Sequence, residues 1–550
     1  MRRCTGGHNR LESRTFSPGF KLADGLIHLR QHDPAIDADT PHASTEPRRR
    51  ALRLAEATAL GGLLLYAVFA PHSIAGAWIA LSVSVLGWLA RAVIRRRTNF
   101  SRASCCRRTP LDLPLLLFYA WSILSALFSA EPRISLLKLI SVSTFLIFYL
   151  VRSLVETRRA AAVAVAVLMI ASGAAGALWS VFEVVRGRGV VVEEIAVDSP
   201  LRHSSLGVAA GDSVWRVNGR RVNSVEEIDQ VIRDAPAGLP LRLSLFSRGE
   251  QTEREGTVSV SDELKARASP SGLRGVRRSH RFRASGWTRH YQTFAETLQI
   301  LAQLSLGFAL AYWQRRSAMR ARDARLRLAL YAAAFLLLAA GIALTAMRTV
   351  LVAFAVGASV VAWRTASRGR ARLVVSAAVV VALAFGAFAV WRTRAEGALR
   401  LQDESSRLRL SVARVALARI PLRPLFGHGM DAVKEHWTEW GFPGQIKIHT
   451  HSTPIQLAFD RGLPALVLWL WLLAVFWIML TRGERELRAA PDEAAAHGLM
   501  LGATGALAGF FASSLVNYNF GDAEVALVLW WLMGTAASIV ARPRVAVEPE

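Results

Sequence analysis

The sequence predicts an all-α polytopic membrane protein of about twelve transmembrane helices, with one small α+β domain inserted in an outer loop. Apolar residues form 52% of the 550-residue chain and charged residues only 20%. The apolar residues are grouped in blocks of about 20, the length that crosses a bilayer as a helix. Basic residues gather between the blocks and raise the formal net charge to +26. Because the blocks leave little room for a water-soluble surface, a soluble enzyme is excluded.

Twelve segments meet this length rule. They lie near 52–70, 74–94, 111–129, 133–151, 160–183, 291–313, 328–346, 348–363, 373–391, 455–480, 498–516 and 523–541. Arginine-rich loops follow the second, sixth, eighth, tenth and twelfth segments. Since loops rich in Lys and Arg stay in the cytoplasm, these loops and both termini are assigned to that side. We interpret the positive charge as belonging to cytoplasmic loops that set the topology and face anionic membrane lipid. We therefore expect no nucleic-acid partner.

This alternation divides the chain into seven parts. We expect a disordered cytoplasmic tail over 1–50, helices one to five over 51–184, a folded domain over 185–265, helices six to nine over 266–392, a catalytic outer loop over 393–454, helices ten to twelve over 455–541, and a cytoplasmic tail over 542–550. Loops as long as the two outer ones are usually functional or folded in their own right.

The first outer loop changes from helical to strand patterns. We expect strands over Val190–Val197, Ser213–Val217, Leu241–Phe246 and Thr257–Val260, and a helix capped by Ser224 that runs to about Ala235. Together with Asp198-Ser199-Pro200, Gly211-Asp212 and Val217-Asn218-Gly219, this pattern resembles a PDZ domain. The resemblance implies a peptide ligand that binds by strand addition. The alternative is a spacer domain that only packs on the membrane part.

A metal site is not expected. PDZ domains also occur in membrane-embedded metalloproteases, which need a helical His-Glu-x-x-His motif to hold zinc. The chain has no such motif, and His449 and His451 have no acidic or cysteine neighbour. We therefore expect neither a metal nor a cofactor.

The second outer loop carries the most specific pattern. Leu408, Val412, Val415 and Ala416 recur at helical spacing and predict an amphipathic helix along the membrane surface. Prolines 421 and 424 end this helix, and a tight turn over Gly427-His428-Gly429 follows. The segment His449-Thr450-His451 then stands at the mouth of the tenth span.

These motifs resemble the O-antigen ligase and polymerase family, the bacterial transferases that use lipid-linked oligosaccharides. Residues 424–429 match its Pro-Leu-x-Gly-x-Gly stretch, residues 451–456 its His-Asn-x-x-Leu-Gln stretch with Ser452 in place of Asn, and residues 460–462 its acidic-x-Gly. Arg283–Gly286 and Thr345–Arg348 match two further features, so the resemblance covers about 280–540.

The resemblance implies a glycosyltransferase of the bacterial inner membrane whose active site faces the periplasm, so that both outer loops are periplasmic. Its donor would be an oligosaccharide on undecaprenyl diphosphate, and its acceptor a glycolipid such as lipid A-core, a glycan or a protein. Transfer would be inverting and independent of metal. The alternatives within the family are an O-antigen or exopolysaccharide polymerase and a protein O-oligosaccharyltransferase. A transporter or flippase and a scaffold are the alternatives from other classes.

The same resemblance suggests roles for individual residues. His451 is the candidate base, because imidazole titrates near neutrality. Arg283 and Arg348 are the candidate diphosphate clamps, because a guanidinium stays charged and grips phosphate oxygens in pairs. Substrate binding is expected from Arg407, Arg409, Arg461, His449 and His428. Each of these side chains has a structural alternative, as an interfacial anchor or a hydrogen-bonding residue of the loop.

Overall fold

The computed structural model describes residues 46–97, 108–156, 158–236, 239–247, 252–275, 277–280, 282–317, 319–366, 369, 404–444, 449–490 and 492–540. The predicted span near 373–391 and the predicted tail over 542–550 lie outside these residues. Most of the tail expected over 1–50 also lies outside them, but residues 46–50 belong to the first described helix.

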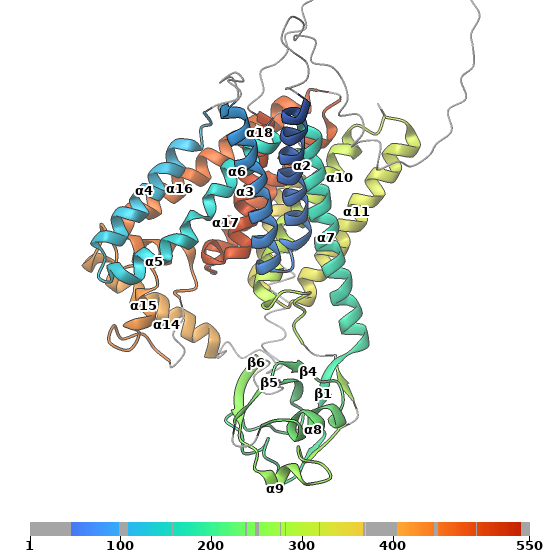
Figure 1. The fold of residues 1–550 in the computed structure, drawn as a ribbon, viewed down its shortest axis with the longest axis vertical. Coiled ribbons are helices and arrows are strands. Elements are labelled where there is room, and N and C mark those ends of the chain that lie inside the picture. The colour runs from blue at the N-terminus through green and yellow to red at the C-terminus, as the bar shows by residue number, and fades with distance from the viewer. Residues whose placement is uncertain are drawn as a thin grey trace, which may run out of the picture. The chain divides into compact units, whose positions relative to one another are not determined.

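The membrane part is built from long apolar helices (Figure 1). They are α2 (Glu46–Phe69), α3 (Ile74–Arg97), α4 (Asp112–Phe128), α5 (Pro132–Val142), α6 (Leu146–Val155), α7 (Arg159–Arg186), α10 (Tyr291–Gln314), α11 (Ala321–Leu344), α12 (Arg348–Thr365), α16 (Thr453–Arg488), α17 (Ala494–Ser514) and α18 (Ala523–Val540). In the described residues, 10 helices are long and apolar enough to cross a membrane when α5 and α6 count as one, and α4 is a shorter apolar helix. The predicted all-α polytopic fold is confirmed.

Helices α10, α17 and α18 form the centre of the bundle. More than four fifths of each apolar stretch is buried inside the protein, whereas α11 and α12 expose most of theirs. Glycines allow the backbones of α10 and α17 to lie close together. A Cβ on Gly307 of α10 would lie 2.3 Å from the backbone nitrogen of Gly502 in α17. Small residues of this kind let two helix backbones pack directly against each other in a membrane.

Two spans are broken near the second outer loop. Between α5 and α6 the chain makes a 3-10 turn, η2 (Ser143–Phe145). Within α16 the backbone leaves the helix at Gly462, where φ is 80°, and Pro464 follows. Irregular backbone at membrane depth is tolerated where it is buried in protein or lines a cavity. Both breaks therefore indicate a cavity in this region.

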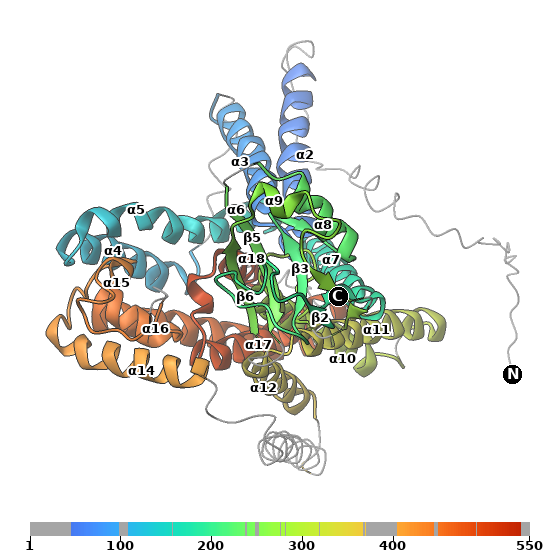
Figure 2. The same ribbon diagram turned by 90° about the horizontal axis from the view of Figure 1, so that it is seen from below.

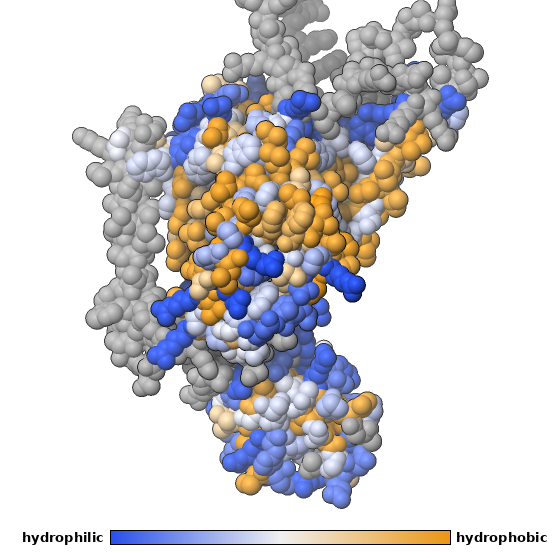
Figure 3. Space-filling model, turned by 90° about the vertical axis from the view of Figure 1, so that its left-hand side faces the viewer, coloured by the Kyte–Doolittle hydropathy of each residue, from blue (hydrophilic) through white to orange (hydrophobic). Residues whose placement is uncertain are grey.

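The helical part carries a band of hydrophobic side chains, which Figure 3 shows between more hydrophilic residues. On α4 the outward apolar residues include Leu113, Leu116, Leu127 and Phe128, each more than half exposed. Exposed apolar side chains in a contiguous band are expected where helices face lipid.

The first outer loop folds as a small α+β domain. Its elements are β1 (Arg188–Val191), β2 (Glu194–Ile195), β3 (Ser213–Val217), β4 (Arg220–Arg221), α8 (Val225–Arg233), β5 (Leu241–Ser247), β6 (Thr252–Val258), α9 (Asp262–Lys265), β7 (Leu273–Arg274) and β8 (Arg278–Ser279). The main sheet has the order β6-β5-β3-β1-β8 with β4 beside β3, and β2 pairs with β7. All pairs are antiparallel.

Local sequence signals predicted a strand and a helix cap of this domain correctly, but they predicted its boundaries less accurately. The strand over 213–217 and the cap are confirmed, since the Ser224 hydroxyl accepts from the Glu227 N–H at 3.2 Å. The strand predicted over 190–197 is divided into β1 and β2, and the last predicted strand begins earlier, at Thr252. The sheet extends to Ser279, beyond the expected end at 265, because β7 and β8 return to pair with the first two strands. The PDZ resemblance itself stays a prediction.

The second outer loop packs on α16. It contains α14 (Glu404–Arg419), η3 (Ile420–Leu422) and α15 (Ala432–Glu435), and Figure 2 shows these helices on the same side as α4, α5 and α16. The predicted helix is confirmed, but Val412 and Ala416 on its apolar face join a buried cluster with Trp437 and Phe459. That face therefore packs against protein, where the sequence predicted a membrane surface.

Candidate functional site

The two motifs at 424–429 and 460–462 dock onto each other. The break of α16 leaves backbone carbonyls without helical partners, and the loop satisfies them. The N–H of His428 donates to Phe459 O at 2.8 Å, and the N–H of Gly429 donates to Asp460 O at 2.9 Å. In return, the N–H of Leu463 donates to Pro424 O at 2.8 Å. Backbone hydrogen bonds thus hold the second outer loop on the broken helix.

Glycine is required at the centre of this contact. Gly462 has a φ of 80°, and a Cβ there would lie 1.8 Å from the carbonyl oxygen of Leu425. Gly427 has a φ of 69°, and its Cβ would lie 2.5 Å from the backbone of Arg461. Only glycine combines this backbone conformation with so close an approach.

The two histidines at the start of α16 lie beside each other. The backbone N–H of His451 donates to the Nδ1 of His449 at 3.2 Å, and the two ring centroids are 4.7 Å apart. His451 has a φ of 57°, an uncommon left-handed conformation for a residue with a side chain. His449 also contacts the ring of Tyr518 at 5.3 Å. Both imidazoles are half-buried.

Burial and nearby cations keep these histidines neutral. Burial is the main cause that lowers the pKa of His451 to about 3, and His449 and the charge of Arg409 lower it further. The pKa of His449 falls to about 4, again mainly by burial and then through Lys434 and Arg409. At neutral pH both imidazoles are therefore uncharged; the lone pair of His449 Nδ1 accepts the His451 N–H, whereas His451 carries a lone pair that can accept a proton.

Arginines 283 and 409 lie close to this pair. Burial lowers the pKa of Arg409, and so does the charge of Arg283. The guanidinium of Arg283 lies over the ring of Tyr291, 4.7 Å from its centroid. Neither arginine forms an ion pair with any residue that the structure describes. Arg283, Arg409 and the two histidines thus form one electropositive group.

Arg348 is exposed at the first position of α12. A short chain of hydrogen bonds links the start of α12 to the start of α16. The Thr349 hydroxyl accepts from Asn517 Nδ2 at 3.1 Å, and the Asn517 carbonyl accepts from the Thr453 N–H at 3.2 Å. Arg348 therefore begins its helix at the same end of the bundle as His451, although no direct contact joins the two side chains.

Two predicted residues lie elsewhere. The ring of His428 is buried and stacked 4.5 Å from Phe459, and its Nε2 is 3.0 Å from the carbonyl oxygen of Arg419. Arg407 is exposed and lines a separate cavity of about 390 Å³ with Arg414 on the outside of α14. The structure gathers neither residue with His451, and His428 serves the folding of the loop.

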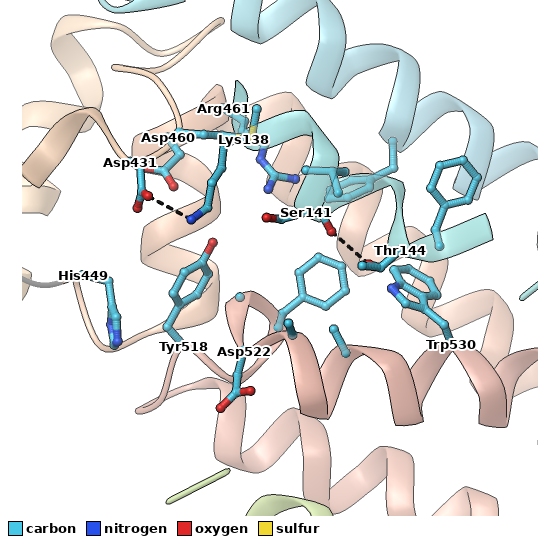
Figure 4. A pocket seen from close by; sticks show the side chains of 18 of the residues that line it. Lys138, Ser141, Thr144, Asp431, His449, Asp460, Arg461, Tyr518, Asp522 and Trp530 are labelled. Carbon is cyan, nitrogen blue, oxygen red and sulfur yellow. Dashed lines mark hydrogen bonds and ion pairs between the residues drawn. The ribbon is translucent and has the colours of Figure 1, made fainter. Parts of the chain in front are cut away.

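A larger cavity of about 440 Å³ adjoins the histidine pair. Figure 4 shows its polar part, where Arg461 and His449 face the same space as Lys138, Asp431 and Tyr518. Leu115, Phe118, Tyr119, Val142, Phe145 and Trp530 form its apolar part. Of the predicted residues, only His449 and Arg461 line this cavity.

Sequence reasoning missed the lysine in this cavity, although a signal was present. Lys138 is the only charged residue between Ile134 and Val151. An ionisable residue inside a membrane span is costly and usually functional, so this lysine alone predicted a polar site in the fourth span. Its ammonium lies 2.8 Å from Asp431, and Lys434 lies 2.9 Å from the same carboxylate. The structure thus adds three residues to the predicted site: Lys138, Lys434 and the Asp431 carboxylate that both lysines contact.

A family model matches part of this region. Residues 333–470 match the model of the O-antigen ligases, which supports the predicted family over a shorter stretch than the 280–540 expected. The match covers α12, the described part of the second outer loop and the broken start of α16. It begins after Arg283 and includes Arg348, His451 and Arg461. No curated protein matches the chain. Within the described residues, no group of three His, Cys, Asp or Glu side chains is placed to hold a metal ion.

Proposed function

We propose that the protein transfers an oligosaccharide from undecaprenyl diphosphate to an acceptor hydroxyl, a proposal that the match of residues 333–470 to the O-antigen ligase model supports. The protein is a multi-pass membrane protein with an O-antigen ligase-type glycosyltransferase domain. The proposed acceptor is a glycolipid such as lipid A-core, and the proposed site faces the periplasm of a bacterial inner membrane. The basic loops at the opposite end of the bundle support this orientation.

One observation carries the proposal: a neutral imidazole lies among guanidiniums that no carboxylate of the described residues neutralises. His451 provides the lone pair, and Arg283 and Arg409 provide the unpaired charge. A base and a binding place for an anionic leaving group are the two requirements of glycosyl transfer from a diphosphate.

The proposed reaction is a direct displacement. His451 accepts the proton of the acceptor hydroxyl while the hydroxyl oxygen forms a bond to the anomeric carbon of the donor sugar. The bond from that carbon to the diphosphate oxygen breaks, and the electron pair leaves with the diphosphate. Arg283, Arg348 and Arg409 offset the negative charge of the leaving group. Because attack and departure take place on opposite faces of one carbon, the configuration is inverted. No cofactor is needed for these steps.

Donor binding would also strengthen the base. A low pKa keeps His451 neutral in the free protein, but an imidazole of such low pKa is a weak proton acceptor. A diphosphate bound to Arg283 and Arg409 would cancel the positive charge that helps to lower the pKa. The pKa of His451 would then rise, although burial, the main cause of its low value, would remain, and the imidazole would become a better proton acceptor. The proposal thus links proton acceptance to the presence of donor.

The test is transfer by the purified full-length protein. The assay supplies a lipid-diphosphate-linked oligosaccharide with EDTA present, and compares lipid A-core, a second lipid-linked repeat and a protein as acceptors. We expect transfer to lipid A-core, and we expect His451→Ala to reduce it by roughly 10²- to 10⁴-fold. His436→Ala is the matched control, because His436 pairs with Glu131 and Glu439 on the loop surface.

Each outcome has a definite meaning. Equal transfer by wild type and His451→Ala would rule out the assigned base. Transfer only to a second lipid-linked repeat would make the protein a polymerase, and transfer only to protein would make it a protein glycosylating enzyme. Loss of transfer in EDTA that added Mg²⁺ restores would contradict the metal-independent reaction.

A further inference from the structure

We infer that residues 517–522, which lie between α17 and α18, position the base and two of the arginines assigned to the proposed reaction by hydrogen-bonding the first turns of α10, α12 and α16. This segment contains η4 (Asn519–Gly521) and lies beyond the stretch that matches the O-antigen ligase model. The inference rests on the proposed function for the roles of His451, Arg283 and Arg348, whereas the hydrogen bonds do not depend on those roles.

Asn517 joins the first turns of α12 and α16. Its Nδ2 donates to the hydroxyl of Thr349 at 3.1 Å, and Thr349 directly follows Arg348. Its backbone carbonyl oxygen accepts from the N–H of Thr453 at 3.2 Å, and Thr453 lies two residues after His451. Asn517 is 1% exposed, and hydrogen bonds are stronger in such a buried place than in water. One buried asparagine therefore links the backbone at a candidate clamp to the backbone at the candidate base.

Asp522 connects the same segment to α10. Its carboxylate accepts from the hydroxyl of Thr293, and also from the Glu524 N–H at 3.2 Å in the first turn of α18. Thr293 lies two residues after Tyr291, and the guanidinium carbon of Arg283 lies 4.7 Å from the ring centroid of Tyr291. The surroundings of Arg283 are therefore held by a helix start that Asp522 contacts.

Tyr518 brings the segment to the histidine pair. Its ring centroid lies 5.3 Å from that of His449, and Figure 4 shows the two side chains close together. His449 in turn accepts the backbone N–H of His451 at its Nδ1, at 3.2 Å. The segment thus contacts the neighbour of the candidate base as well as its helix.

The segment itself is fixed on α17, at the centre of the bundle. Asn519 Nδ2 donates to Phe510 O at 3.1 Å, and Asn519 Oδ1 accepts from the Ser514 hydroxyl at 2.9 Å. The Thr453 hydroxyl has one proton, which it can donate to Asn519 Oδ1 at 3.0 Å or to Asn517 O at 3.1 Å. Catalytic groups need such a rigid support, because a misplacement of about 1 Å can reduce a rate by about 100-fold.

The choice of partners distinguishes positioning from mere folding of a loop. A loop that only connected α17 to α18 would need partners on these two helices alone. Here three threonines from three other helices are bonded, and they lie 229, 168 and 64 positions away in the sequence. Each is within two residues of an assigned residue or of the ring that this residue contacts. Asn517, Asn519 and Asp522 are therefore positioning residues.

Three variants of the full-length protein test the inference, because Thr349→Val, Thr293→Val and Thr453→Val each remove one hydroxyl and keep the shape of the side chain. The first two should raise the KM for the lipid-linked donor roughly fivefold at nearly unchanged kcat, since each loosens an arginine. Thr453→Val should lower kcat roughly fivefold at nearly unchanged KM, since it loosens the base. Thr504→Val is the matched control, because the Thr504 hydroxyl donates to Met500 O in its own helix.

Serine at the same three positions keeps the hydroxyl and should restore both kinetic parameters to within about twofold of wild type. A general loss of stability predicts another pattern, because it lowers the active fraction in every variant and leaves the KM unchanged. Kinetics equal to those of Thr504→Val in all three valine variants would overturn the inference. The same fall in kcat in all three, without a change in KM, would overturn it too.

Hydrogen–deuterium exchange followed by mass spectrometry gives a readout that needs no transfer. Each valine variant should exchange faster at the start of the helix that it loosens, and the Glu484 end of α16 should exchange as in wild type. Unchanged exchange at all three helix starts would overturn the inference even if wild type transfers. Faster exchange together with no transfer by wild type would refute the proposed function and leave the hold of the segment on these helices supported.

Discussion

Charged residues gather at both ends of α16, and the two ends differ in how these charges are paired. At the Glu484 end, the buried carboxylate of Glu484 contacts Arg364 at 2.5 Å, Arg488 at 2.7 Å and His497 at 3.1 Å. Arg315 completes this group by bonding His497 and backbone carbonyls at the end of the helix. At the His451 end, Arg283, Arg409 and Arg461 form no ion pair with any residue that the structure describes.

The difference teaches how to separate structural arginines from binding ones. Both ends contain the same residue types at helix ends within an apolar bundle. At the Glu484 end the protein satisfies its own cations, and helix C-terminal carbonyls add to the balance. At the His451 end, several cations form no ion pair within the described part of the chain, which costs stability that a bound anion would return. Pairing within the chain, and not the number of arginines, therefore indicates function.

The largest expected effect is at the paired end. Glu484→Gln removes the buried counter-charge of the half-buried Arg364 and the exposed Arg488, and we expect a loss of roughly 3 kcal/mol of stability, the low end for a broken buried ion pair, because only Arg364 stays partly shielded from solvent. Thermal unfolding of the purified protein measures it, and Glu486→Gln, an exposed position on the same helix, is the control. A shift in melting temperature no larger than that of the control would contradict the structural role of this end.

At the unpaired end the expected effect is on the donor. Arg348→Lys and Arg283→Lys keep the charge but lose the paired donors of the guanidinium, so the KM for the lipid-linked donor should rise roughly 10- to 100-fold. Melting temperature should stay near that of wild type. Steady-state transfer kinetics provide the measurement, and Arg202→Lys in the inserted domain is the control. An unchanged KM would remove both arginines from the diphosphate site.

A pH profile distinguishes the histidines of the two regions. Diethyl pyrocarbonate modifies neutral imidazole, and burial with nearby cations lowers the pKa of His449 to about 4 and that of His451 to about 3. Their reactivity should therefore persist as pH falls from 8 to 5. The pKa of His436 is raised by hydrogen bonds to Glu439 and Glu131, so its reactivity should already fall above pH 6. Peptide mass spectrometry follows each residue, and a midpoint near 6.5 for His451 would contradict its burial beside cations.

The smallest expected effect is at Arg409. Replacing it with Met removes an unpaired, partly buried charge, so stability should change by less than about 0.5 kcal/mol or increase. Chemical or thermal unfolding without ligand provides the comparison with Glu484→Gln. A loss as large as that of Glu484→Gln would reveal a partner for Arg409 and would end the contrast between the two ends.

The local chemistry of the chain was enough to predict most of the architecture. Span length and hydropathy identified the helices that the structure describes, and turn and cap signals placed Ser213–Val217 and the Ser224 cap. The family motifs predicted the match over residues 333–470. The extension of the sheet to Ser279 was missed, because pairing with β1 depends on residues far away along the chain.

The sequence by itself determined that this is a helical membrane protein with a segment similar to the O-antigen ligases, because hydropathy, span length and motif spacing are properties of neighbouring residues. Only the tertiary structure decided that Gly462 breaks α16 to receive the 424–429 loop, that His428 is buried, and that Lys138 meets Asp431 across a cavity. Charge pairing joins residues about 300 positions apart, as Lys138 and Asp431 are. The sequence shows which cations exist, but whether each has a counter-ion depends on distances that only the folded chain defines.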